Sequence, residues 1–117
     1  MPDRRSKGKG GEDSAVDYLA KKGYHILRRN YRFNRGEIDI IAEDKEDLVF
    51  IEVKARMSRA FGVPENALTP AKCRRIKKVA QGYLYENKID DRSCRFDIVA
   101  IEYDAGIPVI RHLEDAF

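Results

Sequence analysis

The chain has 117 residues, of which 43% are hydrophobic and 37% are charged, and its formal net charge at pH 7 is +3. This length allows one globular domain with a modest core, and no apolar run approaches the ~20 residues that a membrane-spanning helix needs. The sequence therefore argues against a membrane protein. Because the basic N-terminus has no apolar stretch behind it, we also expect no secretory signal and a cytoplasmic location. The two cysteines and two histidines lack the spacing of a zinc site.

The chain begins with a segment, residues 1–10, that is rich in Gly, Lys and Arg and has no apolar periodicity. It is typical of a disordered basic tail, which leaves residues 11–117 as one domain. Residues 12–22 carry apolar side chains at helical spacing and precede Gly23, which predicts a helix stopped by a left-handed glycine. Glu12 in its first turn is either an ordinary partner of the helix dipole or a residue that reaches a functional cluster.

Three strands are predicted next, over residues 24–33, 36–42 and 48–56. The first alternates polar and apolar side chains, as a twisted or edge strand does, and a turn at 34–36 joins it to the second. An acidic connector at 43–47 joins the second strand to the third. Connections this short make consecutive strands antiparallel neighbours.

The third strand becomes charged only near its end. Because side chains alternate along a strand, Glu52 and Lys54 share the face that Leu48 and Phe50 mark as buried. Charge at the edge of a core is costly unless it is paired. One interpretation is therefore a structural ion pair, in which Lys54 neutralises Glu52 or Asp39 and has no further role.

A surplus of negative charge favours a different interpretation. On the second strand, Asp39 lies on the face opposite Ile38 and Ile40, and Glu52 is on the adjacent strand. Two or three carboxylates against one lysine require a further cation. Mg²⁺ fits such a cluster, because one or two carboxylates bind it while water and phosphate oxygens complete its coordination shell.

The remaining chain supplies a loop, a helix and further strands. Residues 56–69 have no clear period, which predicts a mobile loop beside these charges. Phe61 in this loop either packs onto the domain or stacks on a base. Thr69 and Pro70 have the chemistry of the N-cap and first residue of a second helix.

Basic residues concentrate around this helix. Between Lys54 and Lys78 the chain carries eight lysines and arginines and one glutamate. Charge concentrated in this way is typical of a surface that faces phosphate, although a solvated helix face has the same pattern.

A strand over 95–103 and a short edge strand over 107–110 complete the sheet. Asp97 in the first of these is expected to pair with a Lys or Arg of the second helix. The helical crossover makes the third and fourth strands parallel. The sequence therefore predicts an α/β fold in one domain, in the order α-β-β-β-α-β, with a mixed four- to five-stranded sheet and a helix on each face.

The chain resembles the D…ExK signature of restriction-endonuclease-like nucleases, because Asp39 is followed after twelve residues by Glu52-Val53-Lys54. Ile38 stands where that signature often has Pro. Over roughly residues 10–103 the chain is similar to the YraN-like family of small bacterial proteins of uncharacterised function. The shared residues are Gly11-Glu12, Gly23-Tyr24, Arg29-Asn30, Gly36 to Asp39, Phe50 to Arg56, Phe61-Gly62, Lys72 and Arg95 to Asp97. The resemblance implies a fold similar to that of archaeal Holliday-junction resolvases.

The resemblance also implies an Mg²⁺- or Mn²⁺-dependent endonuclease that cleaves phosphodiester bonds in nucleic acid, with branched or junction DNA as the substrate class. Asp39, Glu52, Glu12 and the backbone carbonyl of Val53 would hold the metal. Lys54 would orient the attacking water or stabilise the developing charge, so that the expected catalytic residues are Asp39, Glu52, Lys54 and Glu12.

Four further residues would support this site. Glu37 would contact the metal ligands without binding the metal itself, and Arg56, Lys72 and Arg75 would contact nucleic acid. Because two cuts in a junction need two sites, a homodimer is implied. A nucleic-acid-binding module without catalysis, and a structural or interaction domain whose charges are merely paired, stay open as alternatives.

Overall fold

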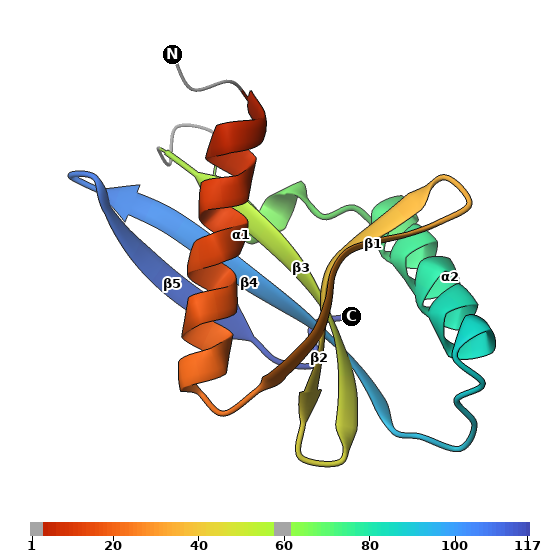
Figure 1. Ribbon diagram of the computed structural model, residues 1–117. Helices are drawn as coiled ribbons and strands as arrows, with labels where there is room; N and C mark the ends of the chain where they lie inside the picture. Colours follow the sequence, from red (N-terminus) through yellow and green to blue (C-terminus); the bar gives the residue numbers. More distant parts are fainter. Residues whose placement is uncertain (1–3, 58–61) are drawn as a thin grey trace.

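One mixed sheet organises the fold. The computed structural model describes residues 4–57 and 62–117, and within them five strands lie in the order β1-β2-β3-β4-β5 (Figure 1). The strands are β1 His25–Phe33, β2 Gly36–Asp44, β3 Asp47–Arg56, β4 Cys94–Asp104 and β5 Ile107–Leu113. β3 and β4 are parallel, and the other neighbouring pairs are antiparallel. The predicted mixed sheet is confirmed, with five strands.

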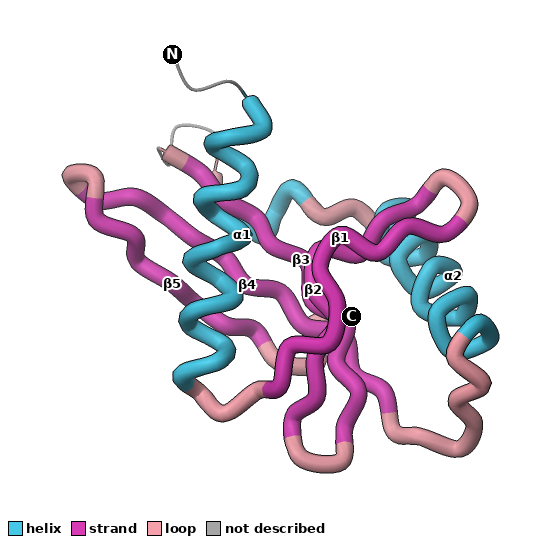
Figure 2. The backbone as a smooth tube through the Cα atoms, viewed as in Figure 1, coloured by secondary structure: helices cyan, strands magenta, loops and turns pink. Residues whose placement is uncertain are grey.

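Two helices cover the two faces of this sheet. α1 spans Arg4–Lys21 and α2 spans Pro70–Glu86, while a short 3-10 helix, η1, spans Pro64–Ala67. Figure 2 shows α1 crossing the sheet and α2 beside the β1–β2 hairpin. Alternating residues of β3 divide between the layers, because Val49 packs on the α1 side and Phe50 on the α2 side. The predicted helix on each face is confirmed.

α1 ends as predicted but begins earlier. Gly23 has a φ of 97°, and the main-chain N–H groups of Gly23 and Tyr24 donate to the carbonyls of Ala20 and Leu19 at 3.0 Å, which is a left-handed helix stop. At the other end the helix begins at Arg4, so that residues 4–10, predicted as a tail, are helical. Each added residue gains one hydrogen bond once a helix is nucleated by its packed part. Residues 1–3 lie outside the described residues.

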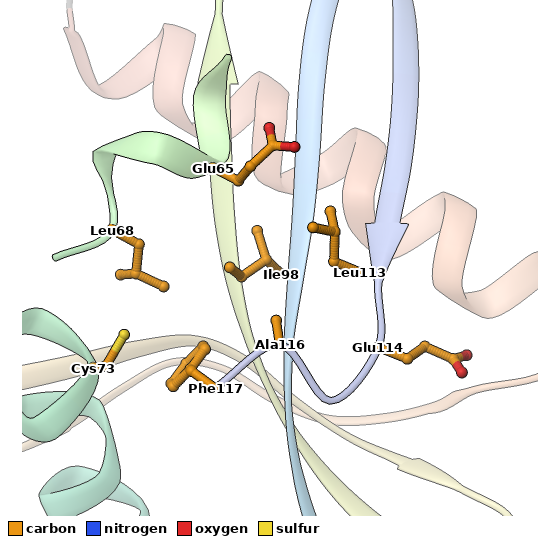
Figure 3. A pocket seen from close by; sticks show the side chains of 8 residues that line it. All are labelled: Glu65, Leu68, Cys73, Ile98, Leu113, Glu114, Ala116 and Phe117. Carbon is orange, nitrogen blue, oxygen red and sulfur yellow. The ribbon is translucent and has the colours of Figure 1, made fainter. Parts of the chain in front are cut away.

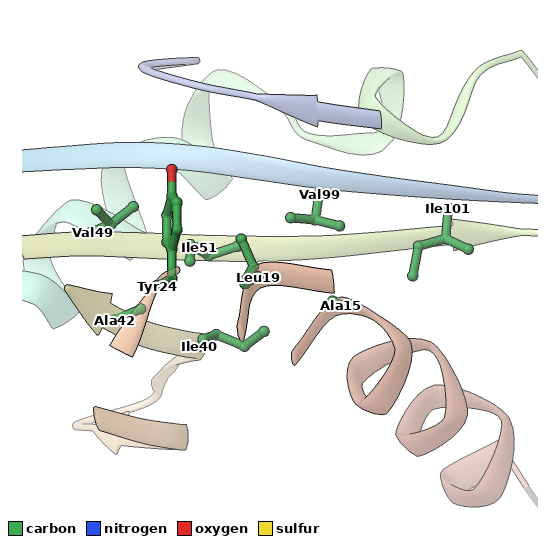
Figure 4. Close-up of a cluster of buried hydrophobic side chains, with 9 residues drawn as sticks. All are labelled: Ala15, Leu19, Tyr24, Ile40, Ala42, Val49, Ile51, Val99 and Ile101. Carbon is green, nitrogen blue, oxygen red and sulfur yellow. The ribbon is translucent and has the colours of Figure 1, made fainter. Parts of the chain in front are cut away.

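The α1 side of the sheet holds one of the two hydrophobic clusters. Figure 4 shows Ala15 and Leu19 of α1 against the side chains of the central strands, and both are fully buried. Neither helix of the described chain is both long and apolar enough to cross a membrane.

The connector between β3 and α2 contains η1, where the sequence predicts only a loop. Phe61, predicted either to stack on a base or to pack onto the domain, lies outside the described residues. The start of α2 is as predicted: Thr69 is the N-cap, its hydroxyl accepts the main-chain N–H of Lys72 at 3.2 Å, and Pro70 is the first helical residue.

The β1–β2 hairpin leaves the sheet and leans on α2. β2 pairs with β3 only from Ile40 onward, and the segment before it pairs with β1 alone. The prediction that Ile38 and Ile40 share a face is wrong, because Ile38 packs on the α2 side and Ile40 on the α1 side. Once β2 has left β3, strand twist is no longer restrained by a neighbour on that side, and the simple alternation ends.

Two glycines permit the close approach of this hairpin to α2. A Cβ on Gly36 would lie 2.3 Å from Val79 Cγ2, and a Cβ on Gly82 would lie 2.4 Å from Phe33 Cγ. Both distances are far below van der Waals contact, so the hairpin backbone packs directly on Val79 and the ring of Phe33 packs directly on the backbone of α2. This contact fixes the position of the hairpin tip.

Gly82→Ala is expected to lower the free energy of unfolding by about 1–3 kcal/mol, since overpacking of this kind costs that much. Gly10→Ala, a matched change in α1 whose Cβ would meet nothing within 4 Å, is expected to raise it by roughly 0.5–1 kcal/mol through helix propensity. Urea denaturation of both variants measures the difference. Equal effects of the two substitutions would show that the hairpin does not depend on Gly82.

Asp97 does not pair with α2, contrary to the prediction. It is completely buried, and alternation along β4 places it on the α1 side with Val99 and Ile101. Its carboxylate accepts two hydrogen bonds from Arg95, at 2.9 and 3.0 Å, and one from the ring of His112 at 2.7 Å. A side chain on a strand can pair only with groups on its own face of the sheet. Asp97 lies on the face that α1 covers, whereas α2 covers the opposite face.

Candidate active site

The predicted carboxylates meet at the fork where β2 leaves β3. The last paired residues of the fork are Ile40 and Ile51. Just beyond this pair, the main-chain N–H of Val53 donates a hydrogen bond of 2.8 Å to Oδ2 of Asp39. A side chain of β2 thus binds a main-chain donor of β3 just where the paired ladder ends. This contact holds the Asp39 carboxylate in the opening between the strands.

Glu52 shares this opening. Burial, and then a hydrogen bond to Asp39 and the negative charge of Asp39, raise the pKa of Glu52 to about 9, while the Lys54 ammonium acts in the opposite direction. At neutral pH Glu52 therefore carries a proton that it shares with Asp39. The two carboxyl groups lie together beside Lys54, as the strand pattern predicts.

Glu12 approaches the same place from α1. Gly11 is buried against the end of β3, and a Cβ on it would lie 3.4 Å from the Cβ of Ala55. Burial and the charge of Asp39 raise the pKa of Glu12. Its Oε1 atom is buried and has no hydrogen-bond partner among the described residues, although Arg29 Nε lies 3.6 Å away. This oxygen forms an ion pair with Arg29 but no hydrogen bond, so it can still accept a hydrogen bond from a water molecule.

The donor set distinguishes between classes of metal. In residues 4–57 and 62–117, no three His, Cys, Asp or Glu side chains are placed to hold a metal ion between them. A structural zinc site needs four such ligands, so these residues do not fit zinc. Mg²⁺ keeps several waters and needs only one or two carboxylates, which Asp39 and Glu52 supply. Glu12 Oε1, which accepts no hydrogen bond from the described residues, adds a further acceptor nearby.

A pocket of about 240 Å³, which we call the carboxylate pocket, opens beside these carboxyl groups. It is lined by Arg35, Gly36, Glu37, Glu52, Lys72, Arg75 and Ile76. Lys72 and Arg75 were predicted to contact nucleic acid, and both lie in this pocket next to Glu52. Arg56 is not part of the described lining; it lies two residues beyond Lys54 on β3, opposite Glu102.

Sequence reasoning missed two basic residues of the site. Arg35 lies at the hairpin turn, and only the lean of the hairpin onto α2 brings it to Arg75. Arg29 contacts both acidic residues of α1 that face it, Glu12 at 3.6 Å and Asp13 at 2.6 Å. Nothing in the alternation over residues 24–33 determines whether Arg29 faces solvent or phosphate, and the available signal was its place among the residues of the family resemblance.

A larger pocket, of about 330 Å³, lies elsewhere. Figure 3 shows it between η1, the end of β5 and the C-terminal residues, with Cys73 and Phe117 on one side. Glu65 on its rim is paired with Arg111 at 2.6 Å. None of the predicted site residues lines it, so it has no part in the chemistry of the fork.

Glu52→Gln is expected to flatten the pH dependence of stability in metal-free buffer. In the folded chain Glu52 keeps its proton to about pH 9, while the unfolded group releases it near its ordinary pKa of 4.5. The folded state binds more protons between these values, so the free energy of unfolding falls as the pH rises through this window. Glutamine keeps a donor for Asp39 and does not titrate. Thermal melting from pH 5 to 9 in chelator measures the difference, and parallel profiles for the two proteins would contradict it.

Known proteins resemble this chain over nearly its whole length. A family model described as "Uncharacterised protein family UPF0102" matches residues 11–101. A UPF0102 protein of Geotalea daltonii is 47% identical over 116 residues, which cover 98% of this chain and 91% of that protein. A UPF0102 protein of Persephonella marina is 46% identical over 111 residues, covering 95% of this chain and 92% of the relative. All the residues of the fork lie inside the matched range.

Proposed function

The chain belongs to the uncharacterised protein family UPF0102, which is the YraN-like family, and from the fork between β2 and β3 we propose that it is a metal-dependent endonuclease. One observation carries the proposal: where β2 leaves β3, the main chain of Val53 holds the carboxylate of Asp39 in the opening, and the neighbouring Glu52 lines a pocket with Lys72 and Arg75. Basic side chains line the adjoining pocket. This combination suits hydrolysis of a phosphodiester bond.

Asp39 and Glu52, with the backbone carbonyl of Val53, would hold Mg²⁺ or Mn²⁺, and Glu12 would support the ion through water. When bound, such an ion polarises the phosphate and lowers the pKa of a coordinated water. Glu52 must release its proton before it can act as a ligand. The hydrogen bond from Val53 keeps Asp39 pointed into the opening throughout.

The basic residues would bind the phosphate groups and stabilise the transition state. Lys54 would orient the attacking water or stabilise the negative charge that develops on the phosphate. Lys72, Arg75 and the newly identified Arg35 would grip the phosphate backbone, with Arg56 further along the strand. Lys72 also donates to the carbonyl of Ala67 at 3.4 Å, which keeps its ammonium near the start of α2.

A binding module without catalysis is the second candidate. It would draw its affinity from the same basic pocket. Two carboxyl groups in a pocket for phosphate oppose that function, since negative charge repels the ligand unless a cation lies between them. The acidic pair beside Lys54 therefore favours the enzyme.

The test is incubation of the purified chain with end-labelled duplex, single-stranded and four-way-junction DNA, in Mg²⁺, Mn²⁺ or chelator. Shorter products are expected with either metal and none with chelator, with branched DNA cut most readily. Salt-dependent binding of DNA without any metal-dependent product would reject the endonuclease and support the binding module without catalysis. Symmetric cuts in the junction would further support a homodimer, which pairs two such sites.

A further inference from the structure

A second hollow adjoins the carboxylate pocket between the hairpin tip and α2. It measures about 140 Å³ and is lined by Phe33, Asn34, Arg35, Gly36, Arg75, Lys78 and Val79. Arg35, Gly36 and Arg75 also line the carboxylate pocket, so the two spaces are contiguous. We call this second space the hairpin hollow.

The hairpin hollow combines an apolar lining with a basic rim. Phe33 and Val79 supply the apolar part, and Val79 is almost completely buried. Arg35, Arg75 and Lys78 supply positive charge, and no acidic residue is part of the described lining. An aromatic ring beside guanidinium and ammonium groups is what single-stranded nucleic-acid sites use, since the base stacks and the phosphate pairs with the cations.

The walls of the hollow are fixed by packing. Phe33 rests against the backbone of α2 at Gly82, and the hairpin backbone rests on Val79 at Gly36. Both contacts join rigid secondary structure, so Phe33 is presented in one place. The hollow is therefore formed before any ligand arrives.

Its size selects the ligand. A cavity of about 150 Å³ is known to hold one benzene ring. The hairpin hollow, at about 140 Å³, has room for one six-membered ring. A pyrimidine base is a single ring of that size, while the fused second ring of a purine would extend beyond the hollow toward the adjoining carboxylate pocket, where the phosphate is expected.

We propose that the hairpin hollow binds the base of one unpaired pyrimidine nucleotide, with its phosphate on Arg75 and Lys78, directly beside the phosphate held in the carboxylate pocket. The inference rests on the proposed endonuclease function and extends it to the substrate. A base held in the hairpin hollow against Phe33 cannot at the same time pair with a complementary strand. The favoured substrate therefore has an unpaired pyrimidine next to the bond that is cut.

Binding of short fluorescent oligothymidylate and oligodeoxyadenylate, measured by anisotropy in chelator, tests this proposal. The wild-type chain is expected to bind the thymidine strand more tightly. Phe33→Leu keeps an apolar contact with Gly82 but removes the stacking face, and should weaken thymidine binding about tenfold. Phe33→Tyr keeps the ring and should bind like the wild type. Lys78→Ala should also weaken binding and lower the salt slope by about 0.7.

Lys77→Ala is the matched control, with the same loss of charge on the same helix. The Lys77 ammonium lies 5.5 Å from the ring of Phe96, away from the hollow, so its salt slope should equal that of the wild type. Equal effects of Lys77→Ala and Lys78→Ala, or equal affinity for the two oligonucleotides, would overturn the proposal. Cleavage plays no part in this readout, so failure of the hairpin hollow and failure of the endonuclease are told apart.

Discussion

Asp39→Asn is expected to reduce metal-dependent cleavage by more than about a hundredfold, the largest functional effect of any single substitution in this chain. Removing a group that merely supports a metal ligand commonly costs 10- to 100-fold in activity, and Asp39 is proposed as a ligand itself. The measurement is the initial rate of product formation from end-labelled junction DNA in Mg²⁺.

The fold should survive this change. The amide oxygen of asparagine can still accept the hydrogen bond that the N–H of Val53 donates to Asp39, and one negative charge disappears from beside Glu52. The melting temperature of the metal-free variant should therefore match or exceed that of the wild type. Asp17→Asn, an isosteric change at an exposed carboxylate on α1, is the control and should leave cleavage unchanged. Normal cleavage by Asp39→Asn would remove the proposed metal site.

Asp97→Ala is expected to lower the free energy of unfolding by about 3 kcal/mol, because it removes the buried carboxylate that binds the ring of His112 and two N–H groups of Arg95. Arg95 keeps more exposed carboxylates, such as Asp44 at 3.1 Å, so the loss falls mainly on the buried ring. The side chains of Asp97 and His112 are 0% and 1% exposed, and Arg95 joins them with two hydrogen bonds. The main-chain N–H of Asp115 also donates to Asp97, at 2.9 Å. Urea denaturation at neutral pH measures the loss.

The pH dependence of this contribution follows from its charge. Burial alone would raise the pKa of Asp97, but the hydrogen bonds from His112 and Arg95 outweigh burial and hold the pKa below its ordinary value. The stabilisation is therefore present at neutral pH and is lost as the pH falls through the folded pKa. Asp47→Ala removes a more exposed carboxylate, 3.5 Å from the same arginine, and should cost less than about 1 kcal/mol. Similar losses for the two variants would show that Asp97 is not the centre of the network.

Local patterns in the sequence predicted most of the fold. Alternation along β3 separates Val49 from Phe50, and the two side chains lie in different layers. Thr69 and Pro70 begin α2 because capping is a property of adjacent residues. The convergence of Asp39 and Glu52 followed in the same way, from two neighbouring strands joined by a short turn.

The wrong predictions concern contacts between distant parts of the chain, which a local sequence pattern does not determine. Ile38 changed layers because β2 leaves its neighbour, which depends on the twist of the whole sheet. Asp97 found partners on β4 and β5 because the layer that each helix covers is decided by packing. Arg35 joined the site only through the contact of the hairpin with α2, which involves residues more than forty positions apart in the chain.

The fork between β2 and β3 has a mechanical consequence. In a continuous ladder, backbone hydrogen bonds would set the separation of two facing side chains. Asp39 and Glu52 lie just past the last ladder pair, so their spacing depends on side-chain contacts alone. Among these contacts, the packing of the hairpin on α2 at Gly36 and Gly82 sets the position of the β2 arm. A substitution there would therefore change the separation of the two carboxyl groups from a distance, while the paired part of the sheet stays unchanged.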